Sequence, residues 1–173
     1  MAMVVTSTPQ LFPSLHVAVV ETPIGRIWVE SDGELITRLS FDPLPVRRAR
    51  IPLVLQLAAT SLNAYFDGKI KKIKLPIQQR GTRFQKMVWR SIGSIPFGKF
   101  KTYSQIASDI GGRSIARTVG NACGSNPIPI IVPCHRVIAS NGLLTGYVGG
   151  LWRKKWLLEH EGVLQRELFD LET

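Results

Sequence analysis

The stretch TYSQIASDIGGRSIARTVGNACG, residues 102 to 124, decides the fold of the second half of this chain. Thr102 is a candidate helix cap, and Gly111-Gly112 stops the helix that it begins. Ser114 is the candidate cap of a second helix that runs to about Cys123. The pattern of helix, tight glycine turn and helix is the outline of a helix-turn-helix, although many helical hairpins share it. The first helix has apolar residues at helical spacing: Tyr103, Ile106, Ala107 and Ile110.

The second of these helices has two unlike faces. Gly120 inside a helix costs about 1 kcal/mol relative to alanine, so we expect that something approaches this face closely. A close helix-helix crossing would explain the small residues but explains Arg117 poorly. We therefore predict that this face contacts nucleic acid. The apolar face comprises Ile115, Val119 and Ala122, and the opposite face comprises Arg113, Ala116, Arg117, Gly120 and Gly124.

The remaining elements predict an α+β protein with a small antiparallel N-terminal sheet and a mostly helical C-terminal part. Alternation and turn residues predict strands at 15–21, 25–30 and 35–41, with a possible edge strand at 69–75. Thr82 is a candidate cap for a further helix, and a last helix is expected over about 152–160. The predicted apolar faces are Leu53, Leu57, Leu62 and Phe66 in an N-terminal helix, and Phe84, Met87, Val88 and Ile92 after Thr82.

The formal charge of +10 is concentrated in one part of the 173-residue chain. Residues 81–158 contain eleven lysines and arginines against the single acid Asp109. This imbalance favours a polyanionic partner, since phosphate contacts supply the sequence-independent part of nucleic-acid affinity. The alternative is a basic surface that is merely solvated.

Cysteine usage and hydropathy predict the compartment. Cys123 and Cys134 lack disulfide-dense spacing, and no secretory pattern begins the chain, so we expect two reduced thiols in an intracellular protein. No apolar run approaches the roughly 20 residues that span a bilayer. His16 has no accompanying cysteine or acid cluster, and we expect neither a metal nor a cofactor.

The chemistry is expected at IPIIVPCHRV, residues 128 to 137, where an apolar, β-like run enters Cys134-His135. A thiol next to an imidazole can lose its proton to that base if a third group orients the imidazole, and Glu161 is available. A buried cysteine that is only a small hydrophobe is the plainer alternative. Asn126-Pro127 predicts a turn before the run, and the glycine-rich residues 139–150 predict a pocket wall or a flexible loop.

Several of these motifs together resemble the O6-alkylguanine-DNA alkyltransferases. The resemblance is close over residues 80–163 and only architectural over 1–79. It implies a ribonuclease H-like domain of structural role at 1–79 and a DNA-binding, alkyl-transferring domain at 80–173. The motifs that carry it are Tyr103, Ala116-Arg117-Thr118-Val119-Gly120, Asn126-Pro127, Pro133-Cys134-His135-Arg136-Val137, Gly146-Tyr147-Val148-Gly149-Gly150 and Glu159-His160-Glu161-Gly162.

The resemblance implies a single-turnover reaction. Cys134 would take the alkyl group from O6 of guanine, and less well from O4 of thymine, as a stable thioether. His135 would act through a water as the base, and Glu161 would orient it. Asn126 would brace the turn, and Tyr103 would aid rotation of the nucleotide and departure of guanine.

The resemblance also implies minor-groove binding, with Arg117 filling the gap that a flipped nucleotide leaves. The carbonyls of Cys134 and Val137 would accept from the guanine amino group. The implied DNA-binding residues are Arg117, Arg113, Ala116, Gly120, Tyr103 and Ser104, and the implied pocket residues are Val137, Tyr147, Val148, Gly149, Pro129 and Met87.

Two departures from relatives matter. Val148 stands where some relatives have serine and keeps the backbone N–H, and the N-terminal region lacks the cysteines with which some relatives bind zinc. We expect a cytoplasmic monomer, nucleoid-associated if prokaryotic, that binds double-stranded DNA with O6-alkylguanine and no membrane; cooperativity on DNA is left open. The alternatives are a non-catalytic alkylated-DNA sensor or helix-turn-helix protein, and a thiol hydrolase of the Cys-His type.

Overall fold

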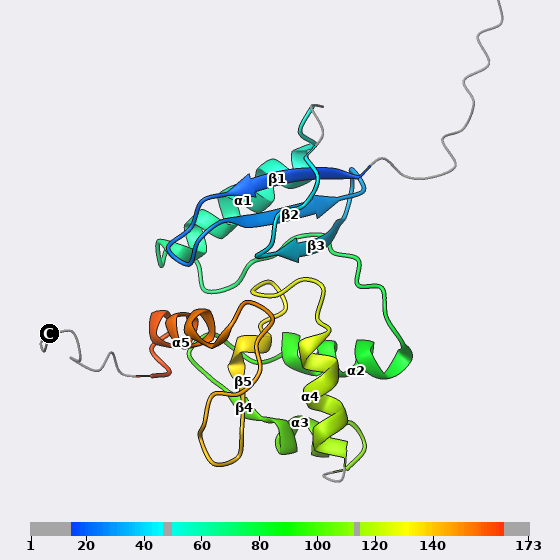
Figure 1. Cartoon of the computed structure of the whole chain (residues 1–173), viewed down its shortest axis with the longest axis vertical. Coiled ribbons are helices and arrows are strands. Elements are labelled where there is room, and N and C mark those ends of the chain that lie inside the picture. The colour runs from blue at the N-terminus through cyan, green and yellow to red at the C-terminus, as the bar shows by residue number, and fades with distance from the viewer. Residues whose placement is uncertain (1–14, 47–49, 113–114, 165–173) are drawn as a thin grey trace, which may run out of the picture.

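The two halves of the chain form two layers of different architecture (Figure 1). The computed structural model describes residues 15–46, 50–112 and 115–164. A three-stranded antiparallel sheet and one helix form the N-terminal half, and most of the helices lie in the C-terminal half, which confirms the α+β prediction. The main elements are β1 (His16–Val20), β2 (Ile27–Ser31), β3 (Ile36–Ser40), α1 (Leu53–Phe66), α2 (Arg83–Gly93), α3 (Tyr103–Ile110), α4 (Ala116–Gly124) and α5 (Leu151–His160).

The sheet forms where the alternation predicted it. In β2 the buried positions recur every second residue, so one face of the strand packs inward. Its pairing with β1 joins Val20 to Ile27, and its pairing with β3 joins Trp28 to Ser40. The turn before β3 is held by Asp32, whose Oδ1 accepts from the N–H of Leu35 at 2.8 Å. Short polar turn residues thus fix an antiparallel order β1-β2-β3.

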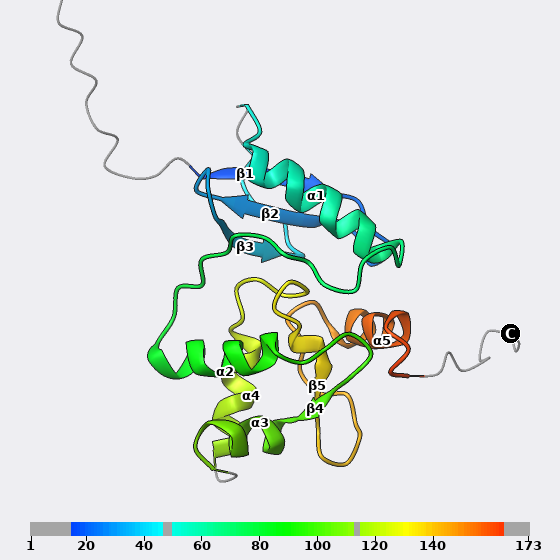
Figure 2. The same cartoon turned by 180° about the vertical axis from the view of Figure 1, so that it is seen from behind.

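Helix α1 covers one face of this sheet, as the rear view shows (Figure 2). It spans the predicted residues from Leu53 to Phe66, but half of its predicted apolar face is wrong. Leu53 is 68% exposed and Leu57 is also exposed, whereas Leu62 and Phe66 are buried as predicted. Leucines occur on two sides of this helix, and only the position of the sheet decides which side is covered. The buried residues are Val54, Leu55, Ala58, Leu62, Tyr65 and Phe66.

The predicted edge strand at 69–75 does not form. The chain instead meets β3 slightly later, at a single parallel bridge between Ile36 and Ile77. The N–H of Ile36 donates to the carbonyl of Pro76 at 2.9 Å, and the N–H of Gln78 donates back to Ile36 at 2.9 Å. A longer ladder is disfavoured here because Pro76 has no N–H to donate.

Helices α2 and α3 begin at the predicted caps. The Thr82 hydroxyl accepts from the N–H of Gln85, and the Thr102 hydroxyl accepts from the N–H of Gln105. Each glutamine side chain accepts in turn from the N–H of its threonine, which completes a capping box. The predicted core position of Met87 is wrong, since this side chain is 39% exposed. Trp89 is buried instead and donates from its indole N–H to the carbonyl of Ala122 at 2.8 Å.

Helices α3 and α4 are joined by the glycine turn that the sequence predicted. The N–H groups of Gly111 and Gly112 both donate to the carbonyl of Ala107, and Gly112 has a φ of 124°, which only glycine adopts freely. The predicted cap Ser114 and the predicted DNA contact Arg113 lie outside the described residues.

The molecule has two hydrophobic cores, and one of them joins the two layers. One lies among α2, α3 and α4, and the other lies between the sheet and α1. The second core also contains Ile128, Ile130 and Leu157 from the C-terminal half. The segment before Cys134 and helix α5 are therefore fixed by packing against the N-terminal domain. No helix within the described ranges is both long and apolar enough to cross a membrane.

Candidate active site

The run at 128–132 is a tight turn rather than the predicted β-like segment. Pro129 and Val132 form an isolated bridge, and the N–H of Val132 donates to the carbonyl of Ile128 at 3.0 Å. Ile130 is buried at the tip with a φ of 73°, a left-handed conformation that disfavours a β-branched residue. Backbone strain of this kind costs about 1–3 kcal/mol and persists only where its surroundings impose it.

Asn126 imposes this turn from inside the protein. Its Oδ1 accepts from the N–H of Ile128 at 3.1 Å, and its Nδ2 donates to the carbonyl of Val132 at 2.8 Å. One buried side chain thus joins both ends of the run, which an extended strand could not satisfy. Nδ2 also lies 3.3 Å from Sγ of Cys134, so the predicted bracing residue contacts the predicted nucleophile directly.

Cys134 begins a short 3₁₀ turn, Cys134–Arg136, that leads into β5 (Val137–Ile138). Strand β5 pairs in parallel with β4 (Lys101–Thr102), which anchors the turn to the start of α3. The Cys134 residue is only 4% exposed. Burial raises the pKa of its thiol to about 11, although the Asn126 hydrogen bond and the positive charge of Lys154 lower it. The resting side chain at neutral pH is therefore a thiol that needs a base.

The predicted base, His135, is held by the predicted acid, Glu161. Nε2 of His135 lies 2.8 Å from Oε1 of Glu161, and both side chains are fully buried. Burial lowers the pKa of His135 below its ordinary value, although Glu161 opposes this, so the imidazole is neutral at neutral pH. Nδ1 has no hydrogen-bond partner within the described part of the chain. Because Nε2 is engaged with Glu161, Nδ1 is the nitrogen left to accept a proton.

Glu161 collects further donors that the sequence did not predict. The Arg136 guanidinium donates to both of its carboxylate oxygens at 2.8 Å, and the Tyr65 hydroxyl donates to Oε1 at 2.6 Å. The N–H of Gly98 lies 3.3 Å from Oε2. Burial by itself raises the pKa of this carboxyl, but the hydrogen bonds from His135, Arg136 and Tyr65 outweigh it and bring the pKa to about 2. Glu161 is therefore a fixed carboxylate at neutral pH.

The glycine-rich loop is held by a buried cation. Nζ of Lys154, on α5, donates to the carbonyl of Thr145 at 2.7 Å and lies 5.7 Å from the Tyr103 ring centroid. Burial lowers the pKa of Lys154 to about 8, although Cys134 and Cys123 raise it. The Tyr103 hydroxyl donates to the same Thr145 carbonyl at 3.2 Å. Tyr103 and Lys154 thus hold the same carbonyl of this loop.

The predicted pocket residues occupy different surroundings. The Tyr147 ring lies edge-on to His135 at 6.5 Å, and its buried hydroxyl has no partner within the described residues. Val148 is exposed. Gly149 is buried, and a Cβ there would lie 2.6 Å from the Phe41 ring, so the packing of the loop against the N-terminal half requires a glycine. Pro129 and Val137 are buried beside the Cys134 turn, and Met87 is exposed on α2.

The predicted nucleic-acid face of α4 is open. Arg117 is exposed, and a Cβ at Gly120 would meet nothing closer than the Tyr103 ring at 3.9 Å. Ala116 lies on the same helix, and Ser104 on α3 lies 3.1 Å from Ser140 between their hydroxyl oxygens. The structure gives no close helix crossing that requires Gly120. The face predicted from Arg117 and its small neighbours is therefore accessible.

Three of the basic residues counted toward a polyanion-binding surface have internal roles. Arg136 and Lys154 are buried, and Arg153 donates to the carbonyls of Ile24 and Gly149. One signal was readable for Lys154, since it precedes the buried Leu157 by three residues and so lies on the apolar face of α5. Tyr65 carried no such signal, because a core tyrosine and a site tyrosine look alike in sequence.

Known proteins match this arrangement. The DNA-binding domain and the ribonuclease-like domain of 6-O-methylguanine DNA methyltransferase match residues 83–163 and 15–79. The methylated-DNA–protein-cysteine methyltransferase of Mycobacterium tuberculosis is 41% identical over 152 residues, which cover 85% of this chain and 92% of that protein. The crystal structure of Mycobacterium tuberculosis O6-methylguanine methyltransferase has a TM-score of 0.77 at 40% identity, covering 86% of this chain and 93% of that one.

A structure of the same mycobacterial protein, OGT, in complex with DNA gives a TM-score of 0.77 at 42% identity, covering 84% of this chain and 92% of that one. The match extends over both halves of the chain, including the segment from α3 to Glu161 that contains the buried cysteine, histidine and glutamate. The chain therefore belongs to the 6-O-methylguanine DNA methyltransferase family.

Proposed function

We propose that this protein repairs duplex DNA by moving the alkyl group of O6-alkylguanine, and less well that of O4-alkylthymine, to Sγ of its own Cys134. The observation that carries the proposal is the buried series Cys134, His135 and Glu161, in which a thiol directly precedes its base in sequence and a carboxylate fixes that base at 2.8 Å. A relative crystallised with DNA supports DNA as the partner. A non-catalytic sensor and a thiol hydrolase are not favoured, because the curated relatives are named methylated-DNA–protein-cysteine methyltransferases.

The proposed reaction is a displacement at the alkyl carbon. His135 takes the thiol proton of Cys134 through a water, the sulfur–carbon bond forms, and the carbon–O6 bond breaks with its electron pair on guanine. The proton returns from His135 to the guanine, and the products are an alkylated cysteine and a repaired base. A thioether is a poor leaving group, so each molecule reacts once.

Recognition is proposed to occur at α3 and α4. The exposed Arg117 enters from the minor groove and occupies the space of the extruded nucleotide, because an atom inside the base stack cannot be attacked in place. Tyr103 exchanges its bond to Thr145 for one to the nucleotide. Backbone carbonyls of Cys134 and Val137 accept from the guanine amino group. Ala116, Gly120, Ser104 and Arg113 complete the DNA contact, and Tyr147, Val148, Gly149, Pro129 and Met87 surround the base.

The test is mass spectrometry of the protein after incubation with duplex DNA that carries one O6-methylguanine. We expect one methyl group per protein molecule, located on the peptide that contains Cys134. Cys134→Ala should bind the same DNA without gaining mass. Cys123 provides a matched control because it is also buried, which raises the pKa of its thiol to about 12, but glycine rather than histidine follows it in the sequence. Cys123→Ala should react like the wild type.

Repeated turnover, or a methyl group found at Cys123, would contradict the proposal. The protein is expected to act as a monomer, which light scattering of the free and DNA-bound protein would check.

A further inference from the structure

We propose that the N-terminal domain takes part in alkyl transfer through Tyr65, a positioning residue whose hydroxyl fixes Oε1 of Glu161 and so sets how strongly that carboxylate acts on His135. This inference rests on the proposed function, because it concerns the same proton relay, which comprises Cys134, His135 and Glu161. It assigns to the N-terminal domain a part in the chemistry, beyond the structural role predicted from sequence.

Tyr65 belongs to the N-terminal domain but reaches the relay of the C-terminal domain. It lies in the last turn of α1 and is only 2% exposed. Its ring packs edge-on against Phe66, Phe97 and His160. Its hydroxyl donates to Oε1 of Glu161 at 2.6 Å, a contact between residues 96 positions apart. A buried tyrosine hydroxyl requires such a partner, and here the partner is the relay carboxylate.

Oε1 of Glu161 is shared by three donors. Tyr65 donates at 2.6 Å, Arg136 donates at 2.8 Å, and Nε2 of His135 lies at 2.8 Å. The Glu161 side chain has no solvent exposure, so bulk water cannot replace a donor that is removed. Two of the three donors come from the Cys134 turn itself, and only Tyr65 comes from the other domain. The position of the N-terminal domain therefore affects Oε1 of Glu161, the oxygen that His135 also contacts.

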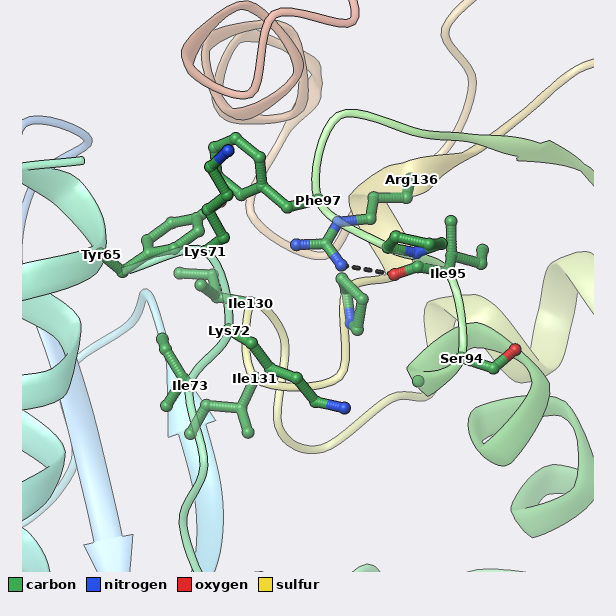
Figure 3. Close-up of a pocket in the computed structure, with 13 residues that line it drawn as sticks. Tyr65, Lys71, Lys72, Ile73, Ser94, Ile95, Phe97, Ile130, Ile131 and Arg136 are labelled. Carbon is green, nitrogen blue, oxygen red and sulfur yellow. Dashed lines mark hydrogen bonds between the residues drawn. The ribbon is translucent and has the colours of Figure 1, made fainter. Parts of the chain in front are cut away.

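The packing around this contact is incomplete. A cavity of about 390 Å³ lies between the domains, and Tyr65 and Arg136 both line it. Figure 3 shows the Tyr65 ring extending from α1 toward the guanidinium of Arg136, with Phe97 and Ile130 near them. Arg136 is held on its other side by the carbonyl of Ile95 at 2.6 Å. A shift between the domains would therefore change the bond from Tyr65 before it changed those from Arg136.

Loss of the Tyr65 hydroxyl should shift the pKa of His135 in one direction. A carboxylate oxygen that loses a donor is a better acceptor for the remaining ones, and it then stabilises an imidazolium more strongly. Removing the Tyr65 hydroxyl therefore raises the pKa of His135. The other ionisable groups around His135 stay in place: Glu161 and Lys154 from α5 and its end, Arg136 and Cys134 from the turn, and Tyr147 from the glycine-rich loop.

The experiment compares Tyr65→Phe with the wild type in two measurements. NMR titration of protein with labelled histidine follows His135 directly, and the chain has only two other histidines. The rate of methyl transfer to Cys134 is measured over the same pH range. Because neutral His135 is the proposed base, we expect both the His135 midpoint and the acid limb of the rate to move upward by about half a pH unit in Tyr65→Phe.

Phe66→Leu is the matched control. Phe66 packs against Tyr65 in the same aromatic cluster, but its side chain has no polar group that could bond to Glu161. It should lower the unfolding midpoint without moving the titration. Superimposable titrations of Tyr65→Phe and wild type would overturn the inference, and so would an equal displacement in Phe66→Leu. If the wild type transferred no methyl group, the proposed function would fail, while the NMR titration would still decide whether Tyr65 acts on His135.

Discussion

The relay behind Cys134 and the open face of α4 follow opposite rules. Glu161 is buried, and its carboxylate is surrounded by donors from three segments of the chain, whereas Arg117 is exposed and Gly120 has room around it. A base that must be aligned to a fraction of an ångström needs fixed neighbours, while a helix that must approach DNA needs free space. Substitutions should therefore affect stability and every substrate at the relay, but only duplex substrates at α4.

The largest effect is expected for Arg136→Met. It leaves the buried Glu161 carboxylate without its paired charge, and removing one partner of a buried ion pair costs about 3–5 kcal/mol. Chemical denaturation should show this loss, and transfer from duplex DNA and from free O6-benzylguanine should fall together. The exposed Lys155, whose Nζ lies 3.7 Å from Oε1 of Glu159, is the control. Lys155→Met should change the free energy of unfolding by less than about 0.5 kcal/mol. A loss in Arg136→Met no larger than this control would refute the prediction.

The next effect is acid destabilisation through Glu161. Its pKa in the folded protein is about 2, against an ordinary value of 4.5, so the unfolded chain binds the proton more tightly. The stabilisation is present above the ordinary pKa and is lost as the pH falls toward the folded value. The free energy of unfolding should therefore fall between about pH 5 and pH 3, and Glu161→Gln should flatten that slope. Equal slopes in both proteins would contradict this.

Arg117→Ala tests the other side of the comparison. We expect repair of duplex DNA to slow by about tenfold, because the extruded nucleotide is no longer replaced in the stack. Reaction with free O6-benzylguanine and the unfolding free energy should stay unchanged, since Arg117 is exposed and lies on the open face of α4. Equal losses on both substrates would place Arg117 in the chemistry instead.

The smallest effect is expected for Gly120→Ala. Alanine is the better helix former by about 1 kcal/mol, and the nearest atoms leave ordinary contact distance for a Cβ, so thermal stability should rise slightly. Duplex affinity, measured by fluorescence anisotropy, should fall because the methyl group stands on the side of α4 that is proposed to face DNA. A gain in stability without loss of affinity would show that DNA does not approach Gly120 closely.

Local chemistry explains why some predictions succeeded. Thr82 and Thr102 begin helices as predicted, because a capping box is complete within four consecutive residues. The strands of the N-terminal sheet follow from alternation and turn residues in the same way. The resemblance pointed to Cys134, His135 and Glu161, and in the structure His135 contacts Glu161 within the turn that Cys134 begins.

Other predictions failed where contacts with a distant part of the chain decide the conformation or the burial of a residue. The apolar run ending at Val132 looked like a strand, but Asn126 ties its ends into a turn. Leu53 and Met87 looked like core residues, but other faces of their helices meet the cores. Arg136 and Lys154 counted as surface charge, but both are buried against specific acceptors.

The sequence by itself determined the order of the elements and the helix starts, because each depends on neighbours a few residues apart. The tertiary structure alone decided which charges are buried, why Gly149 must be glycine, and that Tyr65 contacts Glu161 across 96 positions. These outcomes depend on how two domains pack, and a hydroxyl or a cation gains its partner only when packing removes water from it.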